Sequence, residues 1–430
     1  MDLSRETILK HFLEQEDETA ARVAEGIERN RKADAEIRLL DDAGAPLRGA
    51  RVRARQTRHA FRHGANPFML GGFSDPAEEN AYRDRFAEAF NLATLPFYWK
   101  DLEPEPGKTR YGADAPAIYR RPPPDACLAF CEARGIEPKA HCLDYAAQTP
   151  AWAHGPPERE WELVEGHFRD LAARYAARIP TWEVTNELWW EQDFGSSIYR
   201  SRDFLRRNFE LAARHFPSNR LVSNESSQIW TRDFKGYRSP YFLLLENAML
   251  RGARIDSVGL QFHLFGERES YPKWSEAFLR PDRLFEVLDV YAGLGRPLQI
   301  TEVTVPAWDD DPAAEALQAE TLRRLCEIWF SHPAMEAIVY WNLPDGYGYG
   351  AEPGDFGKGE NVYRGGLLRH DLSPKPAYQA LRDLFGGTWR TDLTAETDAD
   401  GVLRFRGFRG DYELSTDLPG GGTLVRPFSL

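Results

Sequence analysis

Eight short apolar stretches recur through the middle of the chain, and they constrain its fold more than any other feature. They read FRHGAN, NLATLPFYW, EPKAHCLDY, TWEVTNE, RLVSNES, DSVGLQFHLF, LQITEVTV and AIVYWNL, with helical patterns such as WELVEGHFRDLAARYAARI between them. Eight strand–helix units over about 330 residues predict an α/β fold, a (β/α)8 TIM barrel spanning residues 60–388. A doubly wound open sheet is the alternative, but it favours a glycine-rich phosphate loop, and neither GxGxxG nor GxxxxGKS/T occurs.

The two ends of the chain have a different character. Residues 1–34 predict a polar helix, and residues 35–58 predict two alternating strands joined by a turn rich in Asp, Gly and Pro. Residues 395–430 again alternate apolar and polar positions around turns. Because chain termini often lie close together, we expect both β-rich ends to pack as one small accessory module, similar to a β-sandwich, beside the barrel. Two independent edge hairpins are the alternative.

Composition excludes several classes of partner. The chain has 54 Lys+Arg against 67 Asp+Glu, a net charge of −13, and no basic run, so neither nucleic acid nor an anionic membrane is an expected partner. No apolar run reaches the roughly 18 residues of a membrane span. The charged N-terminus lacks the apolar core of a signal peptide, so a chain that begins at its native start is expected in the cytoplasm. Four cysteines without zinc spacing predict free buried thiols, and neither a metal nor a cofactor is expected: Cys127, Cys131, Cys142 and Cys326.

Polar and aromatic residues gather where the predicted strands end. In a barrel these ends converge on one site, and here they carry Trp99, His141, Tyr145, Asn186, Glu187, Asn224, Gln261, His263, Glu302 and Trp341. Such residues are unusual in a core and natural in a cleft. Glu187 closes the fourth predicted strand and Glu302 lies near the end of the seventh, so their carboxylates can face each other across the barrel mouth.

Two such carboxyl groups fit glycoside hydrolysis. One carboxyl, protonated, donates to the leaving oxygen, and the other, ionised, attacks the anomeric carbon or activates water. A separation of about 5–5.5 Å implies retention and about 6.5–9.5 Å implies inversion. The acid needs a raised pKa, which apolar neighbours and the second carboxylate can supply. Trp182, Leu188 and Trp189 are the apolar neighbours that the sequence offers to Glu187.

The same stretches resemble motifs of glycoside hydrolase family 10, the xylanase family. WEVTNE resembles its acid/base motif, W-D-V-V-N-E, and LQITEVTV resembles its nucleophile strand, I-T-E-L-D-I. HCLDYAAQTPAW resembles H-T-L-V-W-H-S-Q-T-P-S-W, SVGLQFHL resembles G-L-Q-S-H-L, and YWNLPDGYGY resembles the eighth strand, F-W-G-L-T-D. GGLLRHDLSPKPAYQAL resembles the closing segment of the family. The matches occur in order from about residue 60 to 388, which makes the set specific.

The resemblance implies a role for each matched residue. Glu187 would be the acid/base and Glu302 the nucleophile of a retaining mechanism. Asn186 would bind the 2-hydroxyl of the sugar at the cleavage site, His263 would orient Glu302, and Gln261 would lie near Glu187. His141 would contact the same sugar, and Trp341 would form its platform.

Departures from the family pattern fall on the sugar-gripping positions. The second-strand Asn and Lys of the family, which hold the sugar one step beyond the cleavage site, fall on Leu95 and Tyr98. The third-strand Trp falls on Tyr145 and the second Trp of the eighth-strand segment on Tyr349, and the fifth-strand pattern appears as NESS with Asn224. We include Tyr98, Tyr145, Asn224 and Tyr349 among the expected substrate-binding residues. Because lost hydrogen-bonding groups change which sugar or aglycone fits, short oligosaccharides or a small glycoside become alternatives to polymeric xylan.

The sequence therefore predicts a retaining β-glycoside hydrolase, similar to endo-1,4-β-xylanases, that acts on xylan, β-1,4-linked xylo-oligosaccharides or a related β-glycoside. A catalytically silent carbohydrate-binding barrel is a second hypothesis, and a metal-dependent barrel hydrolase a third. The β-rich ends alternate with Arg and offer few aromatics, which favours a buttressing role over a carbohydrate-binding module. The sugar, the choice between endo and exo action, and the oligomeric state stay open.

Overall fold

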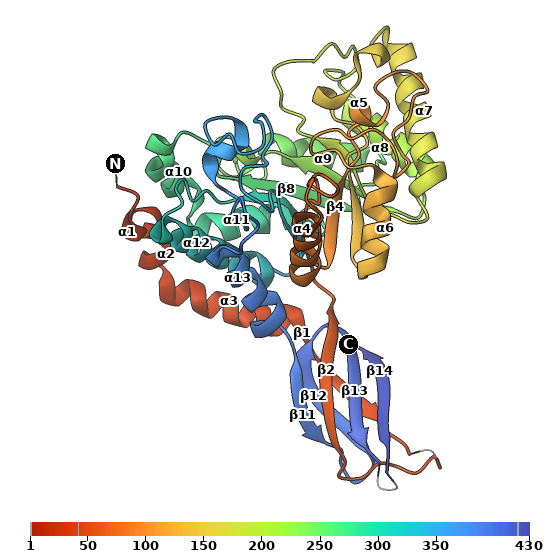
Figure 1. Ribbon diagram of the computed structural model, residues 1–430, viewed down its shortest axis with the longest axis vertical. Helices are drawn as coiled ribbons and strands as arrows, with labels where there is room; N and C mark the ends of the chain where they lie inside the picture. The colour runs from red at the N-terminus through yellow and green to blue at the C-terminus, as the bar shows by residue number, and fades with distance from the viewer. Residues whose placement is uncertain (1, 42, 419–420) are drawn as a thin grey trace.

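The computed structural model describes residues 2–41, 43–418 and 421–430, and its centre is a closed barrel of eight parallel strands (Figure 1). In barrel order these are β3 (Arg62–Ala65), β4 (Leu92–Pro96), β5 (Glu137–His141), β6 (Thr181–Asn186), β7 (Arg220–Glu225), β8 (Ser257–His263), β9 (Leu298–Thr304) and β10 (Met335–Tyr340). Pairing of β10 with β3 closes the ring. Every predicted strand is present, which confirms the barrel.

Helices cover the outside of the barrel between successive strands. The longer ones are α4 (Pro76–Ala89), α6 (Pro124–Arg134), α7 (Pro157–Tyr175), α8 (Phe204–His215), α9 (Pro240–Leu250), α11 (Pro281–Ala292), α12 (Pro312–Ser331) and α13 (Pro376–Asp383). All of these helices except α8 have proline in the first turn, where the missing N–H costs nothing. The Asp75 and Asp311 side chains cap α4 and α12 by accepting backbone N–H groups. None of the described helices is long and apolar enough to span a bilayer.

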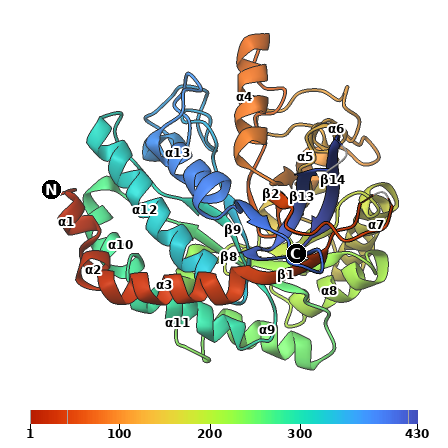
Figure 2. The same ribbon diagram turned by 90° about the horizontal axis from the view of Figure 1, so that it is seen from below.

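The N-terminal segment crosses the base of the barrel as helix and then strand. It forms α1 (Arg5–Ile8), α2 (Lys10–Glu14) and α3 (Glu16–Arg31), so the helix expected to reach residue 34 ends at Arg31 and is broken into three. Lys32 already has extended dihedrals, because pairing in β1 (Lys32–Arg38) replaces the helix there. Figure 2 shows α3 running beside α12. Gly26 permits this approach, since a Cβ there would lie 2.7 Å from the Ser331 carbonyl oxygen.

Strands from both chain ends build the accessory module. β1 pairs with β12 (Val402–Phe408), while β2 (Arg51–His59) lies between β11 (Asp392–Glu396) and β13 (Gly410–Asp417), with β14 (Thr423–Ser429) at the edge. The two sheets share a small apolar core that includes Ile37, Val52, Leu403 and Leu414. The expected accessory β-structure from both ends is thus confirmed, and independent hairpins are not formed.

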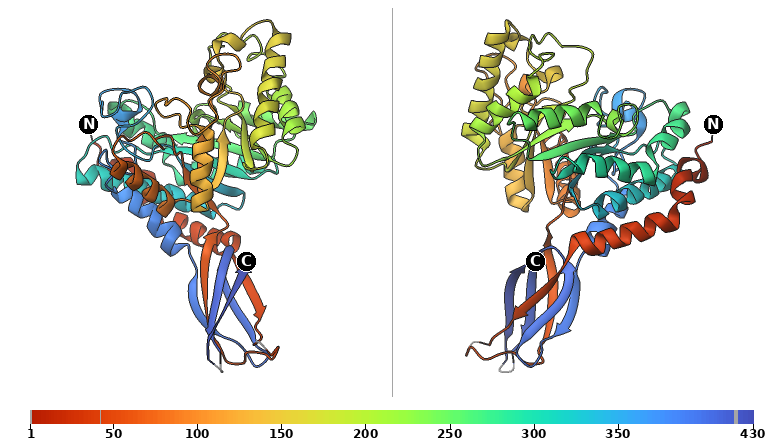
Figure 3. Two further views of the ribbon diagram at one scale, coloured as in Figure 1. Left: turned by 45° about the vertical axis from the view of Figure 1, so that its right-hand side comes forward. Right: turned by 180° about the vertical axis from the view of Figure 1, so that it is seen from behind.

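The accessory module sits against the end of the barrel where the strands begin, as Figure 3 shows from two sides. Trp389 stacks on Phe330 of α12 with ring centroids 4.0 Å apart, and His59 contacts the same ring at 5.7 Å. Arg31 donates to the carbonyl oxygens of Phe330 and His332. Active sites of such barrels lie at the opposite end, so this contact favours a structural role for the module.

Removing residues 389–430 tests that structural role. The truncation deletes β11 to β14 and leaves β1 and β2 without partner strands. It also removes the ring of Trp389 that stacks on Phe330. We expect the shortened chain to be largely insoluble, because unpaired strand edges and an exposed apolar face promote aggregation. Soluble yield and the Tm of any soluble fraction measure this. A soluble barrel with an unchanged Tm would assign the module another role.

Candidate active site

Glu187 follows β6 directly and is held by its backbone. Its φ is +49°, which is uncommon for a residue other than glycine. The Glu187 N–H donates to the Asn224 carbonyl oxygen of the neighbouring strand at 3.1 Å, and the Tyr199 hydroxyl donates to the Glu187 carbonyl oxygen at 3.0 Å. Both peptide groups are satisfied, so the unusual dihedral is fixed and the side chain is aimed into the barrel mouth.

Three donors hold the half-buried Glu187 carboxylate. The Tyr145 hydroxyl and the Trp190 indole N–H donate to its Oε2 at 2.5 and 2.9 Å. The Gln261 amide donates to its Oε1 at 3.1 Å. Tyr145 was expected to bind substrate and Gln261 to lie near Glu187, and the structure places both side chains on this carboxylate. Trp190 is 48% exposed and was not expected here.

Glu302 lies deep in the mouth on β9 and is 3% exposed. Asn224 donates to its Oε1 at 2.9 Å, and His263 Nε2 lies 3.1 Å from its Oε2. Burial lowers the pKa of His263 to about 4, so this ring is neutral near pH 7. His263 Nδ1 lies 3.0 Å from the Thr304 hydroxyl. If that hydroxyl donates to Nδ1, Nε2 carries the proton and donates to Glu302.

A chain of side-chain amides connects the two carboxylates. Gln261 contacts both Glu187 and the Asn186 side-chain oxygen, the latter at 3.3 Å. Asn224 donates to the same Asn186 oxygen at 2.8 Å and to Glu302. Asn224 is fully buried, so it lies beneath the site and positions Glu302 in place of the substrate contact expected from the sequence. The amide nitrogen of Asn186 donates to no described residue and is left for a ligand.

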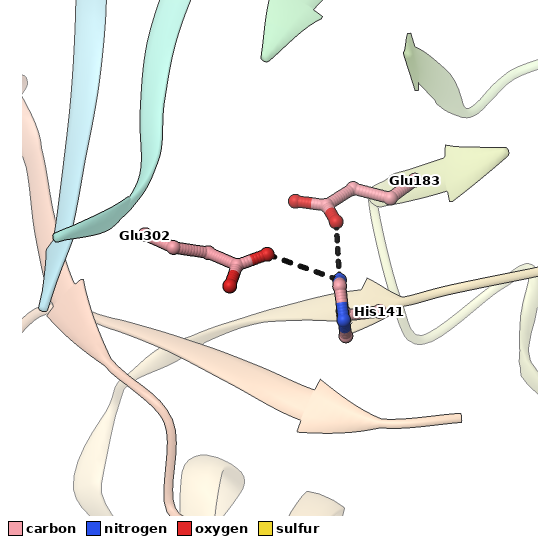
Figure 4. Close-up of side chains that lie close together, drawn as sticks. All are labelled: His141, Glu183 and Glu302. Carbon is pink, nitrogen blue, oxygen red and sulfur yellow. Dashed lines mark hydrogen bonds and ion pairs between the residues drawn. The ribbon is translucent and has the colours of Figure 1, made fainter. Parts of the chain in front are cut away.

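A further glutamate, the fully buried Glu183 on β6, lies close to Glu302 and His141 (Figure 4). Lys139 Nζ donates to its Oε1 at 2.6 Å, and His141 Nδ1 lies 2.5 Å from its Oε2. Burial alone would raise the pKa of Glu183, but the Lys139 ammonium and the His141 imidazole outweigh it and lower the pKa to about 2. Burial opposes charge on His141 as well, yet the Glu183 carboxylate raises the pKa of that ring. Glu183 is therefore ionised, and it forms ion pairs with Lys139 and His141.

His141 brings this positive charge towards the nucleophile position. Its Nδ1 is 3.9 Å from Glu302 Oε1. Burial raises the pKa of Glu302 to about 8, and the charges of Glu183 and Glu187 act in the same direction. The His141 charge and the Asn224 hydrogen bond oppose that rise. His141, expected to touch a sugar, is thus also the cation that favours ionised Glu302.

His141, Glu183 and Glu302 have the residue types of a metal site. One potential ligand atom from each lies within 4.8 Å of the others. However, the Lys139 ammonium already binds Glu183 and would repel a cation placed there. The cluster therefore fits an ion-pair network better than a metal centre.

The aromatic residues predicted at the site divide into buried and exposed ones. Tyr98 and Trp341 are 5% and 7% exposed and pack with Phe68 in one cluster beside His141. Tyr349 is 55% exposed on the loop after β10, outside that cluster.

Two further expectations from the sequence differ from the structure. Trp182 was expected near Glu187, but it is fully buried among Phe97 and Phe216 on the outer side of β6. Trp99 begins the short helix α5 (Trp99–Leu102) and stacks on His167, away from the two carboxylates. Glu183 was missed, although a charge inside an apolar strand is itself a signal for a buried partner.

The fold and this pair of carboxylates at the ends of the fourth and seventh strands define the glycoside hydrolase class. A model of Glycosyl hydrolase family 10 matches residues 78–384, and the chain belongs to that family. The resemblance drawn from the motifs is confirmed.

Xylanases are among the relatives of the chain, and solved xylanases share its fold. The chain is 25% identical to endo-1,4-beta-xylanase B of Thermotoga neapolitana, over 70% of this chain and 83% of that one. It is also 25% identical to anti-sigma-I factor RsgI6 of Acetivibrio thermocellus, over 93% of this chain but 46% of that protein, so it spans about half of that relative. Xylanase 10B from Thermotoga petrophila, solved with xylobiose, has a TM-score of 0.61 at 21% identity, covering 76% of this chain and 95% of that one.

Proposed function

We propose that the chain is a retaining β-glycoside hydrolase of xylanase type. The observation that carries the proposal is the pair of carboxylates with different environments. Glu302 is buried against a cation and two hydrogen-bond donors, and Glu187 is half-buried at the mouth. A buried, oriented carboxylate suits attack on an anomeric carbon, and a more exposed one suits proton exchange with a leaving group and then with water.

The reaction divides into two displacements. In the first, Glu302 attacks the anomeric carbon while Glu187 protonates the departing oxygen, and the bond between sugar and aglycone breaks as a glycosyl–Glu302 ester forms. In the second, Glu187 removes a proton from water, which attacks the same carbon and releases Glu302. The free amide nitrogen of Asn186 suits the 2-hydroxyl, a contact that strengthens in the transition state.

The substrate proposed is a carbohydrate, either xylan, a β-1,4-linked xylo-oligosaccharide or a related β-glycoside. The xylobiose complex of the Thermotoga petrophila enzyme supports this class. A silent binding barrel is the second candidate, but both carboxylates keep a full set of donors, which favours catalysis. The expected cytoplasmic location stays a prediction.

The stereochemistry of the first product tests the proposal. Proton NMR during hydrolysis of an aryl β-xyloside should show the β-anomer first, followed by slow mutarotation, because two inversions give retention. Appearance of the α-anomer first would replace the mechanism by single displacement. Binding without any turnover of xylosides, xylobiosides, cellobiosides, glucosides or arabinosides would favour the silent barrel.

The pH profile should show the raised pKa of Glu302. Because only the ionised carboxylate attacks, kcat/KM should fall as the pH drops through a pKa near 8. His141→Asn removes the opposing positive charge, so this acid limb should move to higher pH. The control Tyr237→Phe changes an exposed tyrosine that packs against Phe242 and contacts none of the site residues named above, and it should leave the limb in place. Rates of an aryl glycoside between pH 5 and 10 measure the limb. Coincident acid limbs for His141→Asn and the unaltered enzyme would contradict the assignment.

A further inference from the structure

Three loops meet on one side of Glu302 and form a closed wall. Phe68 follows β3, Tyr98 follows β4 and Trp341 follows β10, and their rings pack edge to face, with Phe68 centroids 6.1 Å from Tyr98 and 5.4 Å from Trp341. The Arg120 guanidinium lies 5.4 Å from the Phe68 ring centroid. We call Phe68, Tyr98, Arg120 and Trp341 the wall; none of the four is more than 7% exposed. Such packing leaves no groove for a sugar behind it.

The loops of the wall are fastened to one another. Arg120 donates to the Tyr347 carbonyl oxygen of the loop after β10 and lies 3.9 Å from the Glu360 carboxylate. The Tyr119 hydroxyl donates to the Gly348 carbonyl oxygen at 3.3 Å. These contacts join segments more than 200 residues apart, so the loop after β4 cannot swing away without breaking them.

The wall lies one imidazole ring away from the nucleophile. The centroid of the His141 ring is 5.3 Å from that of Tyr98 and 5.6 Å from that of Trp341, and its Nδ1 atom is 3.9 Å from Glu302 Oε1. A pyranose attacked by Glu302 must therefore sit directly against the wall. A second sugar on that side would collide with Phe68 and Tyr98.

The side of the site that carries Glu187 has an exposed aromatic residue, Trp190. Glu187 delivers its proton to the leaving oxygen, so the leaving group lies on the side of Glu187. There Trp190 binds the Glu187 carboxylate through its indole N–H while its ring is 48% exposed. An exposed indole is a suitable platform for the flat apolar face of a sugar or an aromatic aglycone.

We propose that the enzyme releases one sugar at a time from the non-reducing end of its substrate, with the wall as the barrier and Trp190 as the platform for the leaving group. The substrates would be short β-linked oligosaccharides or small glycosides. In each of them a single sugar, the one attacked by Glu302, would lie on the non-reducing side of the cleaved bond. The inference rests on the proposed hydrolase function and narrows it.

A pair of chromogenic substrates tests the inference on the unaltered enzyme. An aryl β-xyloside should be cleaved with a kcat/KM at least about tenfold above that of the aryl β-xylobioside at the aryl bond. Xylotetraose labelled at its reducing end should lose single xylose units and give labelled xylotriose first. Preference for the xylobioside, or internal cleavage to xylobiose, would overturn the inference but leave the hydrolase. Failure of every glycoside would overturn the hydrolase, and the inference with it.

Variants of the wall give an independent readout. Tyr119→Phe removes one of the hydrogen bonds that join the two loops, and Phe68→Ala opens the wall itself. Both should raise the ratio of xylobioside to xyloside kcat/KM several-fold, while the matched control Tyr237→Phe leaves it unchanged. If Phe68→Ala does not fold, Tyr119→Phe still decides. Unchanged ratios in folded variants would contradict the role of the wall.

Discussion

Replacing Glu302 with alanine is expected to lower kcat on an aryl β-glycoside by about 10⁴-fold or more, since the variant has no carboxylate to attack the anomeric carbon. Azide should restore part of the rate, because the small anion fits the space left by the carboxylate. It would attack once, from the Glu302 side, so the product should be the α-glycosyl azide. Rate measurements with and without azide, and NMR of the azide product, provide the readout.

Glu187→Ala is the matched control for that experiment. It removes the proton donor but leaves the nucleophile, so azide should intercept the glycosyl–enzyme and give the β-glycosyl azide. Opposite anomers from the two variants would separate the two roles. Identical anomers, or full activity in either variant, would contradict the assignment of Glu187 and Glu302.

Replacing Glu302 with glutamine is expected to raise the thermal stability of the protein at alkaline pH. A carboxyl whose pKa rises to about 8 on folding costs stability above its ordinary pKa near 4.5, and the full cost is present above pH 8. The neutral amide avoids that cost, so the inactive variant should have a Tm a few degrees above the unaltered enzyme at pH 8 and a similar Tm at pH 4.5.

The second large effect is expected from Glu183→Gln. The change leaves the buried Lys139 ammonium and the His141 ring without their counter-charge, and breaking a buried pair from one side costs about 3–5 kcal/mol. Denaturant unfolding of the two proteins at pH 7 measures the loss. Adding Lys139→Met to Glu183→Gln should recover part of it, because the stranded ammonium is then absent.

The same ion pair predicts a pH window for stability. Folding lowers the pKa of Glu183 from near 4.5 to about 2, so its contribution of about 3 kcal/mol is present above pH 4.5 and is lost as the pH falls towards 2. The difference in stability between the unaltered enzyme and Glu183→Gln should shrink over that interval. A difference that stays constant from pH 6 to pH 3 would show that Glu183 is not the ionised partner.

The barrel and the catalytic pair were predictable because both depend on local patterns. Each strand is an apolar run of a few residues, and strands that begin a β–α unit must end at the same side of the barrel, so Glu187 and Glu302 could be brought together from spacing alone. The accessory module was predictable for a similar reason, since alternation marks strands. The edge strand β14 has no fully buried residue and contains Pro427, and its pattern was correspondingly weak.

The remainder of the site depends on contacts that sequence spacing does not encode. A register shift between Glu183 and Thr185 of β6 interrupts simple alternation, so the directions of Trp182, Glu183 and Asn186 could not be read by counting in twos. Trp190 reaches Glu187 because the loop after β6 folds back, which Tyr199 supports. The wall exists only because side chains from three loops meet.

The most direct test of the account is covalent trapping of the nucleophile. An activated 2-deoxy-2-fluoro-β-glycoside of the sugar preferred in the aryl panel should inactivate the enzyme. The fluorine slows both displacements, while the activated leaving group speeds only the first, so the glycosyl–enzyme accumulates. Mass spectrometry of the intact protein and of its peptides should find one added sugar on Glu302. A label on Glu187 or Glu183, or inactivation without any covalent sugar, would contradict the proposed mechanism.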